Sequence, residues 1–195
     1  FWNFIKDLPN YTRLRKEQKF LISLKNSELL FNDDTNKISL VSIGTVLANG
    51  SATGVGNSFA FNTSSKIEST EASAIMTQAP NWAFSIKGES SGTVLDLGGG
   101  QKIKYVDLGS TAKIQYQVET SSGSHFVEAT GLTPNAWHKV AARIHNGQLQ
   151  LFVDNFTTPV ISSFAGGIVY ANNKLNIAET FTGQLHDLRL YDTTK

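Results

Sequence analysis

Apolar and polar residues alternate along most of the chain after residue 20. In residues 137–145, Val140, Ala142 and Ile144 share one side of an extended segment, and polar residues such as Lys139 share the other. Alternation with a period of two is typical of a β-strand that has one buried face. The pattern therefore predicts an all-β protein rather than a helical one.

Similar short segments, separated by turns rich in residues such as Gly, Asn and Ser, predict strands along the rest of the chain. They cover residues 20–24, 29–31, 38–43, 58–62, 66–68, 82–87, 93–97, 103–106, 113–119, 125–129, 137–145, 148–153, 175–178 and 182–191. The segment 48–57 is rich in Gly, Ser and Ala and is predicted to be a loop. Asn146-Gly147 predicts a two-residue hairpin, because both residue types favour positive φ. Two one-sided sheets packed face to face make a β-sandwich.

The beginning of the chain has a different pattern. Residues 10–18 are predicted to form a short helix, with Pro9 placed where no backbone donor is needed. The cluster Trp2, Phe4 and Ile5 is too apolar for a solvated terminus. We expect it to dock on a neighbouring chain or domain, and packing on the sandwich is the alternative.

Composition narrows the class of protein. Charged residues make up 17% of the 195 residues, against about 25% in an average protein. The formal net charge is only +1, which offers no field to hold nucleic acid. There is no cysteine, and no run approaches the ~18 apolar residues of a membrane span, so we expect neither thiolate chemistry nor membrane insertion.

Several segments resemble the laminin G-like branch of the concanavalin A-like domains. Residues 136–141 (AWHKVA) and 146–155 (NGQLQLFVDN) are similar to that family's W-H-H-V-A strand, Gly turn and L-x-L-Y-V-D-G strand. Residues 175–177 (LNI) and 181–191 (FTGQLHDLRLY) are similar to its L-x-I-G and F-x-G-x-I-D-D-V-R-I-Y strands. The resemblance covers about residues 29–192 and implies an antiparallel jelly-roll β-sandwich of the lectin/glucanase type.

This resemblance divides the chain into an extension, residues 1–28, and a sandwich, residues 29–195. It also implies an extracellular, cell-surface or virion-surface location, because such domains occur in bacterial surface and phage virion proteins. The matched residues mostly build the core, so they indicate a fold more than a function.

The sequence offers no catalytic arrangement that we recognise. Glycosidases of this fold carry an E-x-D-x-E run that points several carboxylates into one groove, and this chain has no such run. Its four histidines are scattered over different predicted strands, and His138 is expected in the core or at a strand edge. We therefore predict that the chain is not an enzyme.

A structural calcium ion is one cofactor that the chain could use. Related sandwiches often hold such an ion between an early loop and the last strand, where this chain has Asp33, Asp34 and Asp187. Carboxylate and carbonyl oxygens are the ligands that calcium prefers. The alternative is that these are turn residues bonded to their own backbone.

Sugar binding needs an exposed aromatic ring and hydrogen-bonding side chains around it. The candidates are Tyr105 and Tyr116 on adjacent predicted strands, together with Tyr170, Asn172 and Asn173 in a predicted rim loop. Such aromatic residues are also common in cores, so the pattern leaves both placements open.

Two functions remain from these observations. The first is a non-catalytic binding or adhesion module of a larger extracellular or virion-surface protein, which recognises a glycan or a protein receptor. The alternative is a structural or decoration protein that docks on neighbouring subunits, or on copies of itself, through Trp2, Phe4 and Ile5. A glycan-active enzyme would need two carboxylates within about 5 to 10 Å of each other.

Overall fold

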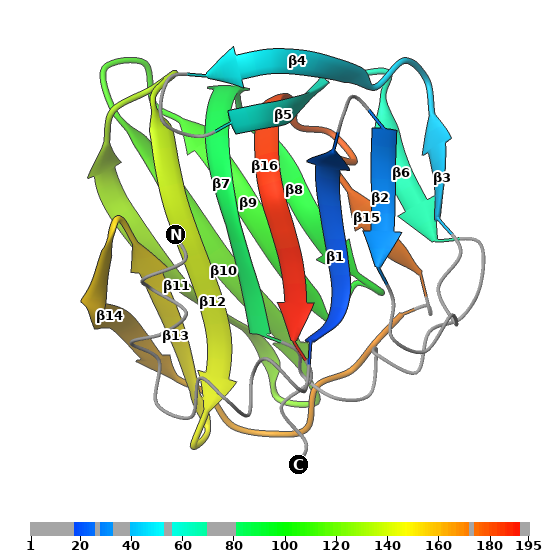
Figure 1. The fold of residues 1–195 in the computed structure, drawn as a ribbon. Helices are drawn as coiled ribbons and strands as arrows, with labels where there is room; N and C mark the ends of the chain where they lie inside the picture. Colours follow the sequence, from blue (N-terminus) through cyan, green and yellow to red (C-terminus); the bar gives the residue numbers. More distant parts are fainter. Residues whose placement is uncertain are drawn as a thin grey trace.

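The computed structural model of the chain describes residues 18–25, 28–32, 40–52, 56–69, 81–171 and 174–191. All secondary-structure elements in these residues are β-strands, and they form two antiparallel sheets that pack face to face (Figure 1). The predicted helix at 10–18 lies outside this part of the chain, except that Gln18 begins the first strand. The described residues contain no helix with the length and apolar character needed to cross a membrane.

The sheet nearer the viewer in Figure 1 has nine strands. Seven of them follow one another in the order β14 (Asn155–Ser163), β13 (Gln148–Val153), β12 (Trp137–His145), β7 (Asn81–Ser90), β16 (Thr182–Tyr191), β1 (Gln18–Lys25) and β2 (Glu28–Asn32). The other two are β5 (Gly56–Phe61), which also pairs with β16, and β4 (Leu47–Ala52), which pairs with β5.

The second sheet has seven strands and lies behind the first (Figure 1). Its order is β11 (Gly123–Leu132), β10 (Ala112–Thr120), β9 (Gln101–Asp107), β8 (Gly92–Leu97), β15 (Leu175–Ile177), β6 (Lys66–Ser69) and β3 (Leu40–Ile43). Every pairing between its strands is antiparallel, as the predicted sandwich requires.

The clearest sequence patterns are confirmed with their bounds. Strands predicted at 137–145, 148–153 and 182–191 are β12, β13 and β16. Asn146 and Gly147 have φ values of 50° and 69°, so the turn between β12 and β13 uses the left-handed conformation that these residue types tolerate.

Two expectations about the first sixty residues need correction. Strand β1 pairs with β16 and β2 inside the nine-stranded sheet, so the described sandwich begins at Gln18 rather than at residue 29. The loop predicted at 48–57 is wrong over most of its length, because β4 forms a hairpin with β5 there. Gly, Ser and Ala have low strand propensity, and backbone pairing with a neighbouring strand overrides it.

The core lies between the two sheets and is made by one side of each strand. In β12, Val140 and Ala142 are 0% and 1% exposed, which confirms the dry side that the alternation predicted. Aromatic side chains fill much of the same layer, among them Trp82, Phe84 and Phe181. This packing is the physical basis of the sandwich, since burial of apolar surface is the main stabilising contribution to folding.

Strand β16 changes partner halfway along its length. Gly183–Leu185 pair with β5, whereas residues from Leu188 onward pair with β1. The change occurs at a bulge, where the register with β7 shifts between His186 and Arg189 and Asp187 has a φ of 52°. One central strand thereby holds together two separate pairs of strands.

Candidate functional site

Alternation along β10 sets the chemistry of the outer face of the seven-stranded sheet. Buried and partly exposed residues follow each other from Ala112 to Thr120, so Gln115 and Gln117 face away from the core. Neighbouring strands β9 and β11 keep the same register and present their polar side chains on the same side. We call this surface the polar platform. It comprises Lys102, Lys104, Lys113, Gln115, Gln117, Glu119, Ser124, Phe126 and Glu128.

One group of contacts on the platform centres on Glu128. Its Oε1 accepts a hydrogen bond from Lys113 Nζ at 2.7 Å and another from Gln115 Nε2 at 2.7 Å. The bond from Lys113 lowers the pKa of Glu128, and the bond from Gln115 adds to this effect while partial burial opposes it. Glu128 is therefore held as a carboxylate that accepts hydrogen bonds.

A second group of contacts joins three strands. Lys104 Nζ on β9 donates to Gln117 Oε1 on β10 at 2.9 Å, and Gln117 Nε2 donates to Glu119 Oε1. The other carboxylate oxygen of Glu119 accepts from the hydroxyl of Ser124 on β11, and this bond is the main reason why the pKa of Glu119 is lowered. Bonds between side chains of neighbouring strands fix these groups in place before any ligand arrives.

The platform is close to neutral in charge. Its three lysines stand beside its own two carboxylates and a third one, Asp96 on β8, whose Oδ2 lies 3.3 Å from Lys102 Nζ. Such an arrangement creates no strong field for an anionic or a cationic ligand. It suits a ligand that offers many neutral hydrogen-bonding groups.

Phe126 gives the platform an aromatic ring. It is 52% exposed and lies opposite Gln117 across the β10–β11 ladder. Cross-strand neighbours stand about 5 Å apart, so the ring is within reach of an amide and of the two carboxylate groups described above. An exposed aromatic ring beside fixed donors and acceptors is the combination that stacking and hydrogen bonding to a sugar require.

The two tyrosines predicted from strands lie in the core. Tyr105 is 1% exposed and Tyr116 is 0% exposed, so neither ring presents a face at the surface. The hydroxyl of Tyr116 donates to Gln101 Oε1 at 2.8 Å, and Gln101 Nε2 donates to the Tyr170 hydroxyl at 2.9 Å. Burial raises the pKa of both Tyr105 and Tyr116, so both keep their protons.

Tyr170 is the candidate that the structure places nearest to the surface. Its ring is partly buried and lies so close to Gly100 that a Cβ there would stand 2.4 Å from Tyr170 Cδ1. Asn172 and Asn173 lie outside the described residues. The structure therefore brings Tyr170 and Tyr116 together through Gln101, in a contact that supports the rim rather than the platform.

Of the predicted calcium ligands, only Asp187 falls within the described residues; Asp33 and Asp34 do not. Both carboxylate oxygens of Asp187 accept hydrogen bonds from Arg189, from Nε at 2.9 Å and from Nη2 at 2.8 Å. The part of the chain that the structure describes contains no group of three His, Asp or Glu side chains suited to a metal ion. A calcium ion held by Asp33, Asp34 and Asp187 stays a prediction, and Trp2, Phe4 and Ile5 also lie outside the described residues.

His138 is confirmed as an interior residue, 6% exposed. Its Nε2 donates to the carbonyl of Thr133 at 2.9 Å, and its Nδ1 lies 2.7 Å from Asp154 Oδ2. The other oxygen of Asp154 accepts from the backbone N–H of Lys139 at 2.8 Å. With both ring nitrogens occupied by protein atoms, His138 joins two loops at one end of the sandwich and is not available as a general base.

Ser122 and His125 are the pair that most resembles a catalytic dyad, since Ser122 Oγ lies 3.3 Å from His125 Nε2. The Ser122 hydroxyl donates to the carbonyl of Ala165 at 2.7 Å, so its proton points away from the imidazole. A serine activated as a nucleophile donates to its base instead. This contact therefore supports a turn and not a reaction.

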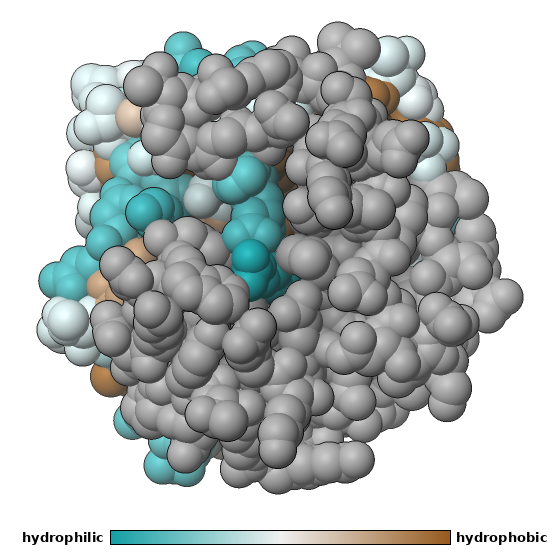
Figure 2. Space-filling model, in the orientation of Figure 1, coloured by the Kyte–Doolittle hydropathy of each residue, from teal (hydrophilic) through white to brown (hydrophobic). Residues whose placement is uncertain are grey.

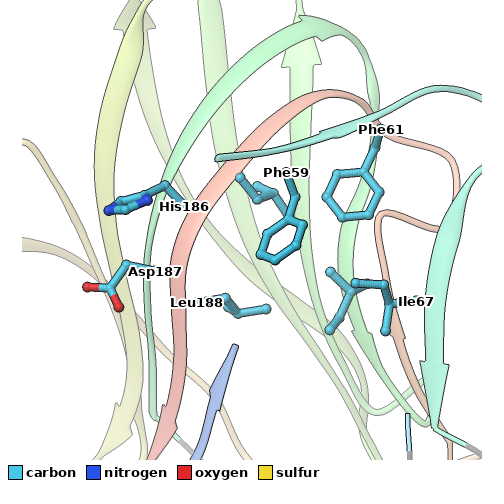
Figure 3. Close-up of a pocket in the computed structure, with 8 residues that line it drawn as sticks. Phe59, Phe61, Ile67, His186, Asp187 and Leu188 are labelled. Carbon is cyan, nitrogen blue, oxygen red and sulfur yellow. The ribbon is translucent and has the colours of Figure 1, made fainter. Parts of the chain in front are cut away.

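A small void lies inside the sandwich beside the β16 bulge (Figure 3). Phe59, Phe61 and Ile67 border it from β5 and β6, and Leu188 points toward them, whereas His186 and Asp187 point away. Its walls are apolar, and it has no convergent polar groups to orient a ligand. We interpret it as a packing defect next to the bulge and not as a binding site.

The outer face of the nine-stranded sheet is built differently. Ala83, Ala141 and Phe152 are 3%, 7% and 4% exposed, although none of them belongs to the core cluster between the sheets. Ala141 lies opposite Ala83 on one side and Phe152 on the other, so the three form one row across β7, β12 and β13, which we call the outer row. Figure 2 views this face and shows hydrophilic surface over β7 and β12 as well.

Sequence reasoning missed the polar platform, and a signal for it existed. Tyr116 is in phase with Ile114 and Val118, which indicates the interior, whereas Phe126 is in phase with Ser124 and Glu128, which indicates the exterior. The phase of an aromatic residue within its own strand thus separates a ring between the two sheets from a ring on an outer face.

Comparison with known proteins supports the fold and leaves the family open. No protein-family model and no curated protein matches the sequence. The binding domain of botulinum neurotoxin serotype D matches in structure with a TM-score of 0.72 and 13% identity over 93% of this chain, which spans only 49% of that domain. Domain 4 of an extracellular arabinanase from Geobacillus stearothermophilus, solved with arabinotriose, gives a TM-score of 0.64 and 15% identity over 90% of this chain and 92% of that domain.

Domains LG4-5 of the mouse laminin alpha1 chain match with a TM-score of 0.51 and 14% identity, over 86% of this chain and 46% of that one. At such low identity these matches establish the fold alone. They confirm that the chain folds as an antiparallel jelly-roll β-sandwich.

Proposed function

We propose that this chain is a non-catalytic glycan-binding domain of a larger extracellular or virion-surface protein, and that the polar platform is its binding surface. The observation that carries the proposal is the exposed ring of Phe126 beside Gln117, Glu119 and Glu128, in a network of side chains that hold one another in place. In this arrangement the ring stacks on the apolar face of a sugar, and the surrounding amides and carboxylates bond its hydroxyls.

The platform's electrostatics favour an uncharged sugar. The lowered pKa values of Glu119 and Glu128 keep both groups ionised as acceptors, and the adjacent lysines neutralise them. A general acid of a glycosidase needs the opposite, a carboxyl group whose pKa is raised so that it carries a proton. These two groups are therefore suited to binding and unsuited to glycoside cleavage.

The structural matches support a binding role by analogy. One match is described as the binding domain of a neurotoxin, and another was solved in complex with an arabino-oligosaccharide. Phage tailspike protein 2 also contains a part of this fold, with a TM-score of 0.54 over 80% of this chain, which is compatible with a virion-surface setting. The alternative ligand for the polar platform is a protein receptor.

The test is a glycan array with the purified chain, followed by titration of the best neutral oligosaccharide. Phe126→Ala is expected to weaken binding about tenfold, equivalent to ~1.4 kcal/mol. Ile161→Ala is the matched control, because Ile161 is 49% exposed but lies on β14 of the other sheet. Absence of any glycan binding would reject the function, and equal affinities for the two variants would reject the platform as its site.

A structural or assembly role is the second candidate, and one observation favours it. Strand β14 lies at the end of the nine-stranded sheet and exposes Val160 (45%) and Ile161 (49%) to solvent. Unpaired strand edges with apolar side chains promote association between chains. Light scattering of the full chain over a range of concentrations separates the candidates, since an assembly protein associates whereas a self-contained binding domain stays monomeric.

A further inference from the structure

The outer row is buried on the side of the sheet that faces away from the core. Ala83, Ala141 and Phe152 are all less than 8% exposed, yet they are separate from the cluster of core side chains. Ser85 and Gln150, which share this outer side, are 2% and 7% exposed. On a solvated sheet face, by contrast, alternate residues are exposed, as on the polar platform.

The shape of this area suits large apolar side chains. Ala83, Ser85 and Ala141 end at or just beyond Cβ, so their side chains leave room above β7 and β12 for larger side chains of another segment. Phe152 lies opposite Ala141, and the guanidinium of Arg143 lies 5.4 Å from the centre of the Phe152 ring. Burial lowers the pKa of Arg143, which is a further sign that this side of the sheet is screened from water.

We propose that the outer row is the docking site of the apolar segment at residues 1–8 of the same chain. That segment carries Trp2, Phe4 and Ile5, whose side chains are large and apolar, whereas Ala83, Ser85 and Ala141 in and beside the outer row are small. In an extended segment Trp2 and Phe4 point to the same side, so both rings can pack on the outer row together. The apolar segment thereby packs on the sandwich to which it belongs.

The connection to β1 makes this docking feasible. Gln18 begins β1 opposite Tyr191 of β16, and Tyr191 lies opposite Asn81, two residues from Ala83. The outer row thus starts close to Gln18, the first residue of β1. From β1 to β13 there are four strand spacings, or about 19 Å, whereas the fourteen residues from Phe4 to Gln18 reach about 46 Å when extended.

A tether of this length favours the same chain over a second copy. Short flexible connections give effective concentrations in the millimolar range, well above the concentration of free protein in most solutions. Docking on a neighbouring subunit, which the sequence suggested first, becomes an outcome that the experiment distinguishes.

The experiment places a nitroxide spin label beside the two rings of the full-length chain. The sequence has no cysteine, so Asn3→Cys provides a single attachment site. We expect the label to reduce the amide NMR signals of Ala83, Ala141 and Phe152 at least fivefold, while those of Gln117 and Phe126 on the opposite sheet keep their intensity. Unaffected signals in the outer row would overturn the proposal.

A mixed sample distinguishes one chain from two. Chain that carries the spin label but no isotope is mixed with chain that is enriched in nitrogen-15 but carries no spin label. In this mixture only contacts between copies reduce the signals. Reduction in this sample would assign the outer row to a second copy and overturn docking within one chain. We expect none.

Substitutions provide an independent measurement on the intact chain. The double variant Trp2→Ala/Phe4→Ala is expected to raise the equilibrium constant for unfolding at least thirtyfold. In the Phe152→Ala background the same double substitution is expected to have less than a third of that effect, because the contact is already lost. Additive effects of the two changes would overturn the proposal even if all variants fold.

Discussion

The outer face of the seven-stranded sheet is polar and partly exposed, and its side chains form hydrogen bonds with one another. The outer face of the nine-stranded sheet instead buries a row of apolar side chains outside the core. Each face carries a phenylalanine on the second strand of a hairpin, Phe126 on β11 and Phe152 on β13, and these two are 52% and 4% exposed. Local sequence does not separate them, since each is in phase with the polar residues of its own strand. The difference shows that an outward-facing position is solvated only when nothing else packs on its sheet.

The largest expected difference between the faces is in stability. Phe152→Ala should lower the free energy of unfolding by about 3 kcal/mol, because it removes a buried ring. Phe126→Ala should change it by no more than about 0.5 kcal/mol, since the ring is half exposed. Urea denaturation of both variants measures this difference, and equal losses would show that the two faces are not distinct.

A matched pair of glutamines gives a smaller effect in the same direction. Gln150 is 7% exposed, and its Oε1 accepts from Arg143 Nε at 2.7 Å, so Gln150→Ala leaves a half-buried guanidinium without this partner. We expect a loss of about 1.5 kcal/mol. For Gln117→Ala on the platform we expect about 0.5 kcal/mol, because water can replace its partly exposed contacts. A larger loss for Gln117→Ala would reverse the comparison.

The smallest effect is the pH dependence of the platform. The pKa of Glu128 is lowered in the folded state, chiefly by the hydrogen bond from Lys113. The ionised Glu128 therefore stabilises the fold above the ordinary glutamate pKa of about 4.3, and this stabilisation is lost as the pH falls. Glu128→Gln should therefore make stability less sensitive to pH between about pH 5 and pH 3. Glu179→Gln, at an exposed position, is the control. Thermal unfolding of the unmodified chain and of both variants over this pH range measures how steeply stability depends on pH. If the platform contacts contribute nothing, this dependence is the same in all three proteins.

Sequence patterns predicted the sandwich because its strands carry their own signals. β12 and β13 alternate strictly and are joined by Asn146-Gly147, so both strands and their turn are local properties. Strand β4 lacks such a signal, since Leu47–Ala52 becomes a strand only through its pairing with β5. Long-range pairing is absent from any local window of sequence, and this is why the loop prediction was wrong there.

The candidate site was harder to predict than the fold. Tyr105 and Tyr116 have the residue type that binds sugars, but their phase within β9 and β10 points them inward. The contacts of Lys104, Gln117 and Glu119 join three strands and depend on register, which the sequence does not state. Residue type suggested the chemistry, and only the arrangement of strands decides which side chains can perform it.

The position of β16 has a consequence for how the protein is made. The strand that spans Thr182–Tyr191 lies between β7 and the β1–β5 side of the nine-stranded sheet, although β1 is synthesised more than 150 residues earlier. On the ribosome, β1 and β2 can form only a hairpin with each other until β16 emerges. Such late closure of distant partners slows folding and leaves strand edges open during synthesis. A nascent chain stalled before residue 182 should accordingly be the species most prone to aggregate or to recruit chaperones.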